Sequence, residues 1–470
     1  MNLGATHIAS LFGLHLSPRL ALFLTLAFIV YLFRRDIREE PNVSGALWIP
    51  TLWMFLVASE PPTYWLRLAS IPIVGGSREE GNPIDATVFL ALTLAGLYVL
   101  NQRGVNLSEF AQNNQWITIF FIFCFLAIFW SDFPFVSFKR WIKIIGHPVM
   151  VLVILSEPDP VETVVRLFKR VAYVVLPVSI LWIKYYPRLG RGQDEWGSTN
   201  NHGITIGKNG LGIVSCIFAL VFVWHLLRVL RTEKSSIRRN EIRLIIVLLL
   251  MTGWCLGKAH SATSWMALIV AGVVMMILGF RTLNLRLIGA YAGAAAVALV
   301  IAQLTFDVYG KVVDITGHKA TLQERGRLWE QLLHYQKSPV FGVGFESFWL
   351  GDRRREFQET YPYTQAHNGY LETYMNVGIV GLLILIACIL ATFYKCRHEL
   401  LRDFDWGRLR MGLLIAVVLH NWAEASFVGL CFPFLVFFLA AIDYPAVAIA
   451  SSPASLEATT AEEEIELVYR

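Results

Sequence analysis

The sequence has little charge and little cysteine, and these two shortages limit the kinds of protein it can encode. Only 16% of its 470 residues are charged, against about 25% in ordinary soluble domains. By contrast, 56% are hydrophobic and the mean hydropathy is +0.53. The six cysteines lie in or beside apolar segments, with neither a disulfide framework nor a Cys/His metal spacing. A soluble multidomain protein and a disulfide-stapled secreted protein are therefore excluded.

Apolar runs close to the ~20 residues needed to cross a bilayer recur along the whole chain. We predict an all-α, polytopic integral membrane protein with about 12 to 13 transmembrane helices, forming one domain over residues 1–450. The expected spans are 17–33, 44–59, 84–101, 115–131, 141–156, 171–187, 209–230, 242–257, 262–280, 284–306, 374–395, 407–421 and 427–447. Residues 1–16 lack the pattern of a cleavable signal, and we expect none. Residues 451–470 are expected to be a disordered acidic tail.

The basic residues predict which side of the membrane each loop faces. When the loops are alternated, the segments on one side carry 20 Lys and Arg, whereas those on the other carry about 10. The segment 228–243 alone holds six of the 20. By the positive-inside rule this side is the cytoplasm, and one large loop, 307–373, faces outward. The net charge of +5 is then mainly a topology signal, and we expect no nucleic-acid partner.

The 307–373 loop is long and polar, and loops of this length are usually functional. Within it, Thr321 and Glu324 form a capping-box pattern, followed by apolar residues at helical spacing. The pattern predicts a helix that starts at Thr321 and stops before Pro339. Arg325 would lie in its first turn, where unpaired N–H groups favour an anion, and would complete a diphosphate site. The alternative is an arginine solvated on a surface helix.

The motif HNGYLE closes this loop, directly ahead of an apolar span. An unperturbed histidine titrates near neutrality, which suits His367 as general base for a hydroxyl nucleophile. Asn368, Tyr370 and Glu372 follow and are expected to contact substrate. Glu372 lies in the next helical turn, where it would either orient the imidazole or bind sugar hydroxyls. The alternative for His367 is a helix-capping or interfacial histidine.

Polar side chains also gather at the predicted outward ends of the spans. Four of them are expected to bind substrate: Arg140, Lys208, Asn209 and Lys258. Charges near membrane depth are costly, so they usually face a cavity, a partner or the interface. Together with Arg325 these cations suit an anionic, lipid-linked substrate. The alternative for each lysine or arginine is a side chain that extends to lipid phosphate.

Three further patterns have simpler interpretations. The GVGF segment at 342–345 supplies glycines for close backbone turns, and the aromatic pair Phe348 and Trp349 predicts either an interface anchor or stacking on sugar rings. The Asp-x-Asp pattern at Asp403 and Asp405 has no nucleotide-binding fold around it and is ascribed to chance. We expect no metal and no cofactor.

Taken together, these motifs resemble the O-antigen ligase/polymerase family, particularly its exopolysaccharide-polymerase branch. HNGYLE followed by a Gly-rich span is the most specific match. The matching stretches follow the family's order: SDFPFVSFKR (131–140), GKNGLG (207–212), HSATSWMAL (260–268), ATLQERGRLW (320–329), SPVFGVGFESFW (338–349) and AHNGYLETYMNVGIVG (366–381).

The resemblance implies a GT-C-like membrane glycosyltransferase at the outer, periplasmic face of the bacterial inner membrane. It implies inverting transfer of a glycan from an undecaprenyl-diphosphate carrier to an acceptor hydroxyl. Arg325 would hold the diphosphate, His367 would be the base, and Arg140 and Lys208 would contact substrate phosphates. Trp329, which also matches the family pattern, is a further expected substrate contact.

The function implied is polymerisation of lipid-linked repeat units in exopolysaccharide or O-antigen biosynthesis. The implied partners are the undecaprenyl-diphosphate-linked glycan, the lipid bilayer and other polysaccharide assembly and export proteins. One alternative is a ligase that transfers glycan to lipid A-core. Another is a flippase that transports the lipid-linked glycan, which would give the 307–373 loop and His367 no obvious task.

Overall fold

The computed structural model describes residues 16–444, apart from 40–41, 74, 77–80, 194–198, 281–283, 292, 295–318, 337, 361–364 and 428. The predicted tail at 451–470 and most of the expected span at 284–306 lie outside the described residues. Within these residues the strands form one short antiparallel hairpin, β1 (Arg191–Gln193) and β2 (Thr199–Asn201). Nearly all the remaining regular structure is helical.

The helices of the first half are α2 (Pro18–Arg38), η1 (Gly45–Leu47), α3 (Trp48–Ala58), α4 (Pro62–Leu68), α5 (Pro83–Gln102), α6 (Leu107–Asn113), α7 (Gln115–Leu126), α8 (Pro134–Leu155), α9 (Pro160–Tyr185) and α10 (Pro187–Gly190). Those of the second half are α11 (Gly207–Val229), α12 (Ser236–Ala259), α13 (Ala262–Ile277), η2 (Leu285–Leu287), α16 (Lys319–Tyr335), α17 (Gly351–Thr360), α18 (Gly369–Arg402), α19 (Phe404–Ala423) and α20 (Phe432–Ala441).

Every expected span other than that at 284–306 coincides with one of these helices. Among the described residues, four helices are individually long and apolar enough to cross a bilayer: α5, α11, α12 and α18. The apolar helices α3, α7, α13 and α20 are shorter. The predicted all-α, polytopic membrane fold is confirmed. The total of 12 to 13 spans stays a prediction.

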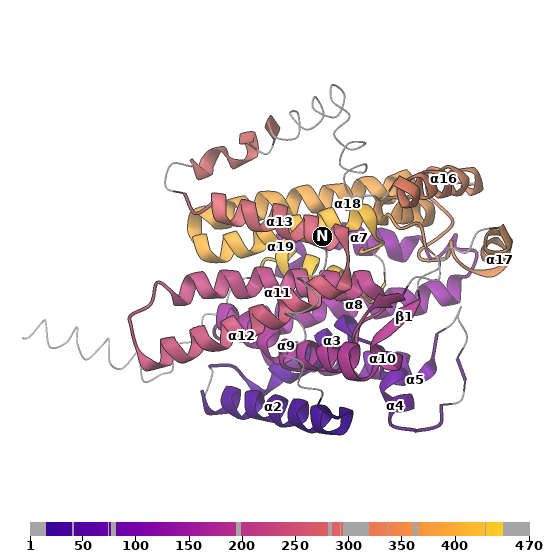
Figure 1. Ribbon diagram of the computed structural model, residues 1–470. Coiled ribbons are helices and arrows are strands. Elements are labelled where there is room, and N and C mark those ends of the chain that lie inside the picture. Colours follow the sequence, from indigo (N-terminus) through magenta and orange to yellow (C-terminus); the bar gives the residue numbers. More distant parts are fainter. Residues whose placement is uncertain are drawn as a thin grey trace, which may run out of the picture.

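The long helices run side by side, so the molecule has two ends (Figure 1). Helices α16 and α17 and the β1–β2 hairpin lie at one end, together with the start of α18. The connection between α11 and α12 lies at the opposite end, and the basic segment 228–243 spans it and the adjoining helix ends. The predicted separation of the basic segment from the large loop therefore agrees with the arrangement of the helices.

Helix α18 is broken near its start, and the large loop bonds to the break. Val377 (φ −125°, ψ 15°) and Gly378 (φ 69°, ψ −171°) are not helical. The freed carbonyl of Asn376 accepts the N–H of Gly344 at 2.9 Å, and its side-chain oxygen accepts a second N–H from the 338–350 segment at 3.0 Å. Backbone groups inside a membrane protein need such internal partners, because lipid offers none.

The predicted role of the GVGF glycines is confirmed. Gly342 and Gly344 have φ of 69° and 106°, and a Cβ on either would lie 2.3 Å from Asn376 O or Ser131 Cα respectively. The aromatic prediction is wrong for Phe348, which is 1% exposed and packs in a small core with Leu328 and other loop residues. The ring of Phe348 packs inside the loop, so neither lipid nor a sugar ring can contact it.

At the opposite end, charges are buried in pairs. Asp36, which is fully buried on α2, accepts from Arg166 at 3.1 Å and from Arg170 at 2.8 Å, both on α9. Lys169 of α9 pairs with Glu241 of α12 at 2.9 Å. Buried charges are tolerated when they are paired and hydrogen-bonded. Several of the basic residues that predict orientation therefore also join helices.

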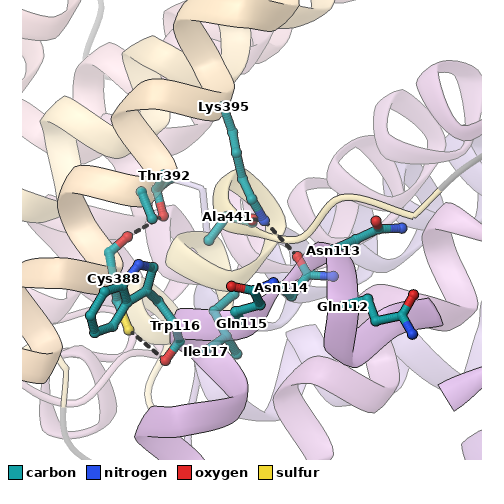
Figure 2. A pocket seen from close by; sticks show the side chains of 11 residues that line it. Gln112, Asn113, Asn114, Gln115, Trp116, Ile117, Cys388, Thr392, Lys395 and Ala441 are labelled. Carbon is teal, nitrogen blue, oxygen red and sulfur yellow. Dashed lines mark hydrogen bonds between the residues drawn. The ribbon is translucent and has the colours of Figure 1, made fainter. Parts of the chain in front are cut away.

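A small pocket of about 130 Å³ lies between the start of α7, the end of α18 and the end of α20 (Figure 2). Lys395 points into it and donates to Asn114 Oδ1 at 2.7 Å and to the carbonyl of Ala441 at 3.0 Å. A third oxygen, Oδ2 of Asp443, lies 3.7 Å from the same ammonium. These three oxygens surround the ammonium of Lys395. The side chain therefore links α18 to the start of α7 and the end of α20, at the end of the molecule remote from the large loop.

The predicted orientation can be checked by thiol labelling in intact cells, because the native cysteines are buried or, for Cys431, partly buried. We expect Arg355→Cys on α17, where the side chain is 72% exposed, to react with a membrane-impermeant reagent. Ser235→Cys in the basic segment should react only after permeabilisation, since the positive-inside rule places it in the cytoplasm. The reverse pattern would show that the orientation is inverted.

Candidate active site at the start of α18

The carboxylate of Glu424 is the point at which three predicted site residues meet. Its Oε2 atom lies 3.2 Å from His367 Nδ1, and its Oε1 atom lies 3.2 Å from Arg325 Nη2. The side-chain amide of Asn209 donates to the same Oε1 atom at 2.7 Å. We call these four residues the Glu424 cluster. Glu424 is 8% exposed, so the contacts are largely shielded from water.

The Glu424 cluster is assembled from four separate parts of the chain. Glu424 follows the last residue of α19, and His367 stands two residues before α18. Arg325 lies on α16, and Asn209 is the third residue of α11. All four elements end or start at the same end of the bundle (Figure 1). The site therefore depends on helix packing rather than on any one continuous motif.

The prediction that Arg325 lies in the first turn of its helix is wrong. Helix α16 begins at Lys319 rather than after a cap at Thr321, so Arg325 is its seventh residue and lies beyond the N–H groups that a helix leaves unpaired. The helix start that reaches the cluster is instead that of α11. Its N-cap residue, Ile206, has no side-chain oxygen with which to cap these N–H groups.

Lys208 is the second residue of α11 and is half-buried. Its backbone is thus adjacent to that of Asn209, whose side chain reaches Glu424. A helix start carries a partial positive charge. Together with Lys208 and Arg325, the start of α11 makes this corner of the molecule suitable for a phosphate group.

His367 is held by the start of α18. Its φ of 48° is left-handed, which is uncommon for a residue with a side chain. The N-cap of α18 is the next residue, Asn368, whose Oδ1 atom accepts from the N–H groups of Tyr370 at 3.0 Å and Leu371 at 3.1 Å. The alternative in which His367 caps the helix is therefore wrong. The Oδ1 atom of Asn368 therefore caps α18, and the expected contact of Asn368 with substrate stays a prediction.

Glu372 is not the residue that orients the imidazole. Its Oε2 atom accepts the N–H of Ala366 at 3.0 Å, and its Oε1 atom accepts from the indole N–H of Trp349. Both carboxylate oxygens are thus used to hold the loop just before His367. The carboxylate that contacts the imidazole is instead that of Glu424, the last residue of the sequence HNWAE (420–424).

Three aromatic side chains lie beside the cluster. Trp329 donates its indole N–H to the carbonyl of Ala366 at 2.9 Å, and Tyr370 donates its hydroxyl to the carbonyl of Val418 at 3.1 Å. The ring of Trp422 lies between them, with centroids 6.4 Å from Trp329 and 6.3 Å from Tyr370. Trp422 is 56% exposed, so it offers an apolar face on which a sugar ring could stack.

Arg140 belongs to a different group. Its guanidinium donates a hydrogen bond to the backbone carbonyl of Glu346 in the large loop. Burial raises the pKa of the Glu346 carboxyl, although the charges of Arg140 and Lys143 and a hydrogen bond from the Gly429 N–H oppose that rise. The structure therefore ties Arg140 to the loop rather than to the Glu424 cluster.

Lys258 also lies apart from the Glu424 cluster. Its ammonium stands over the ring of Trp254 on the same helix, 5.8 Å from the centroid, and the side chain is exposed. Its carbonyl accepts from Asn201 of β2 at 3.1 Å. The structure favours the alternative of a lysine that extends along its own helix to the surface.

Comparisons with known proteins were made for the whole chain. Residues 244–386 match the O-antigen ligase family, a range that contains Arg325 and His367 but neither Asn209 nor Glu424. The exopolysaccharide production protein ExoQ of Rhizobium meliloti (strain 1021) is 28% identical over an alignment of 315 residues, and the match covers 61% of this chain. The chain is O-antigen ligase/polymerase-like. The match spans 66% of ExoQ, just under two thirds of its length.

In this O-antigen ligase/polymerase-like chain, Glu424 is an ionised group despite its burial. Burial favours the neutral form, but the hydrogen bond and charge of His367 and the charges of Arg325 and His420 together lower the pKa of Glu424. The carboxylate is thus a fixed negative charge between an imidazole and a guanidinium.

Asp403 and Asp405 both make structural contacts, which agrees with the interpretation that their Asp-x-Asp pattern arose by chance. Asp403 caps α19 by accepting the N–H of Trp406 at 3.0 Å, and Asp405 pairs with Arg231 at 3.1 Å and with Arg408 at 3.0 Å. In the part of the chain that the structure describes, no group of three or more His, Cys, Asp or Glu side chains could hold a metal ion.

Because Gly369 has no side chain, the start of α18 can lie directly against Asn421 of α19. A Cβ there would lie 1.9 Å from Oδ1 of Asn421, which in turn accepts the N–H groups of Ser426 at 2.9 Å and Phe427 at 3.0 Å. Because Asn421 shapes the turn that carries Glu424, we expect Gly369→Ala to separate His367 from Glu424. Turnover per folded molecule should fall at least tenfold, which is the lower end of the effect of misplacing a catalytic group. Gly257→Ala, at a site with open space around it, is the matched control. Equal turnover in the two variants would show that the close approach is unimportant.

Proposed function

We propose that this protein is an inverting membrane glycosyltransferase that polymerises undecaprenyl-diphosphate-linked repeat units for exopolysaccharide or O-antigen. The observation that carries this proposal is the Glu424 cluster, in which one carboxylate contacts both a histidine and an arginine at 3.2 Å. A hydroxyl nucleophile requires a base, and a diphosphate leaving group requires a cation. Both are supplied within one cluster at the end of a membrane helix bundle.

In the proposed reaction, an acceptor sugar hydroxyl attacks the anomeric carbon of the donor in a single displacement. The bond from that carbon to the diphosphate oxygen breaks, and its electron pair leaves with undecaprenyl diphosphate. The hydroxyl proton passes to Nε2 of His367, because Nδ1 faces Glu424. Arg325, Lys208 and the start of α11 would neutralise the leaving diphosphate. A lipid diphosphate is already a good leaving group, so we propose positioning and charge without a metal or cofactor.

Polymerase is favoured over ligase by the relative ExoQ, whose name refers to exopolysaccharide production. The ligase alternative, transfer to lipid A-core, is kept because the matching family is described as O-antigen ligase. We disfavour the flippase because translocation gives the pairing of His367 with Glu424 no task. The proposed site is the outer face of the bacterial inner membrane, with assembly and export proteins as partners.

The test is an assay with the purified protein in lipid nanodiscs and an undecaprenyl-diphosphate oligosaccharide. Polymer together with released undecaprenyl diphosphate is expected. Transfer to added lipid A-core, without polymer, would support the ligase instead. Neither product from an intact, folded protein would refute the proposed chemistry.

His367→Ala should lower polymer formation by roughly 10²–10⁴-fold, the usual contribution of a general base. Donor binding should change little, since the proposed donor contacts are on α11 and α16. Turnover is measured per folded molecule, because a purely structural histidine would lower the folded yield alone. More than about a tenth of wild-type turnover would lie outside that range of rate loss and would argue against the base.

Arg325→Lys should restore only part of the activity that Arg325→Ala removes. Lysine keeps the charge but loses the planar fork of donors that matches two phosphate oxygens. The affinity for undecaprenyl diphosphate and the turnover number should both be highest in the wild type, lower in the lysine variant and lowest in the alanine variant. Arg327→Lys, at an exposed position on the same helix, is the matched control. Wild-type donor affinity in Arg325→Ala would remove this residue from the proposed site.

A further inference from the structure

The two oxygens of Glu424 are used by groups with different proposed tasks. Oε2 contacts His367, the proposed base. Oε1 contacts Arg325 and Asn209, which lie at the corner where the donor diphosphate is proposed to bind. A carboxylate oxygen and a phosphate oxygen are both anionic hydrogen-bond acceptors. Oε1 of Glu424 therefore occupies a place that suits a donor phosphate oxygen.

We propose that Glu424 and the donor diphosphate compete for Arg325 and Asn209, and that donor binding leaves Glu424 to act on His367 alone. In this exchange Arg325 and Asn209 turn from Oε1 to the phosphate oxygens, while Oε2 keeps the imidazole. The inference rests on the proposed function and adds a positioning residue that couples donor binding to the strength of the base.

The geometry of the ion pair favours the exchange. Arg325 reaches Glu424 through Nη2 at 3.2 Å, whereas the strong arginine–anion pairs are bidentate and shorter. Asn209 is a neutral donor and would bind a phosphate oxygen equally well. A diphosphate offers several oxygens in the spacing that a guanidinium fork fits. The donor is therefore the better acceptor for both groups.

The exchange would change the charge that His367 experiences. While Arg325 is paired with Glu424, its positive charge offsets part of the negative charge of the carboxylate that faces His367. Once the diphosphate neutralises Arg325, Glu424 acts on His367 without that offset. The other titratable groups whose charges act on His367 or Glu424 are Glu372 on α18 and His420 on α19. Glu372 is already committed to Trp349 and Ala366, and His420 to Ser426 at 2.6 Å.

The distinguishing test is Glu424→Gln, which keeps the size of the side chain and removes its charge. If Glu424 competes with the donor, this variant should bind undecaprenyl diphosphate more tightly, by roughly tenfold, the value of one charge-assisted hydrogen bond. Its turnover should nevertheless fall at least tenfold, because His367 loses its carboxylate. Opposite changes in affinity and turnover are not expected from general damage to the site.

The matched control is Glu372→Gln, a second buried carboxylate near His367 whose hydrogen bonds go to the loop. This variant should not tighten binding. In an Arg325→Ala background, Glu424→Gln should lose most of its tightening. If Glu424→Gln does not fold, affinity and turnover are measured for Glu424→Asp instead. The expected gain in affinity is then smaller, because the shorter side chain moves the negative charge away from Arg325 without removing it.

Binding that is unchanged or weaker in folded Glu424→Gln would overturn the inference, and so would tighter binding with wild-type turnover. Failure of the proposed function would look different. In that case the wild-type protein would not bind undecaprenyl diphosphate, or Arg325→Ala would bind it as well as wild type.

Discussion

A helix broken inside a membrane protein must have its freed backbone groups bonded by protein, because lipid has no donors or acceptors for them. In α18 this requirement falls at Val377 and Gly378, and the large loop meets it. Pro339 and Val340 accept the N–H groups that follow the break, and Gly344 donates to the carbonyl before it. The loop is thereby held against the end of the bundle. His367, which stands one short helical segment ahead of the break, is positioned as a result.

The second constraint is the burial of a charge. An ionised carboxylate that is 8% exposed needs partners, and Glu424 finds them on three other elements. Each of those partners is a group that a lipid-diphosphate transferase would use. The need to satisfy one buried anion therefore also gathers an imidazole, a guanidinium and the start of a helix in one place.

Parts of this site could be predicted because their signal is local. A histidine ahead of an apolar helix, an arginine in a polar loop, and the glycines of GVGF are all recognisable from their neighbours in the chain. Errors arose where local patterns competed. The capping box at Thr321 suggested a helix start, yet α16 begins at Lys319. Phe348 has the composition of an interface anchor, yet burial in the loop core gives it more apolar contact.

Composition and hydropathy were sufficient for the membrane class and for the positions of nearly all the helices that match expected spans, because crossing a bilayer constrains each segment separately. Motif order was sufficient for the resemblance to the O-antigen ligase family, which matches residues 244–386. The partner of His367 was not predictable in this way. Glu372 is five residues away and was the obvious local candidate, whereas Glu424 is brought close only by the packing of α18 against α19 and of Gly369 against Asn421. Pairing of side chains between helices depends on their relative position in space, which no local pattern in the chain encodes.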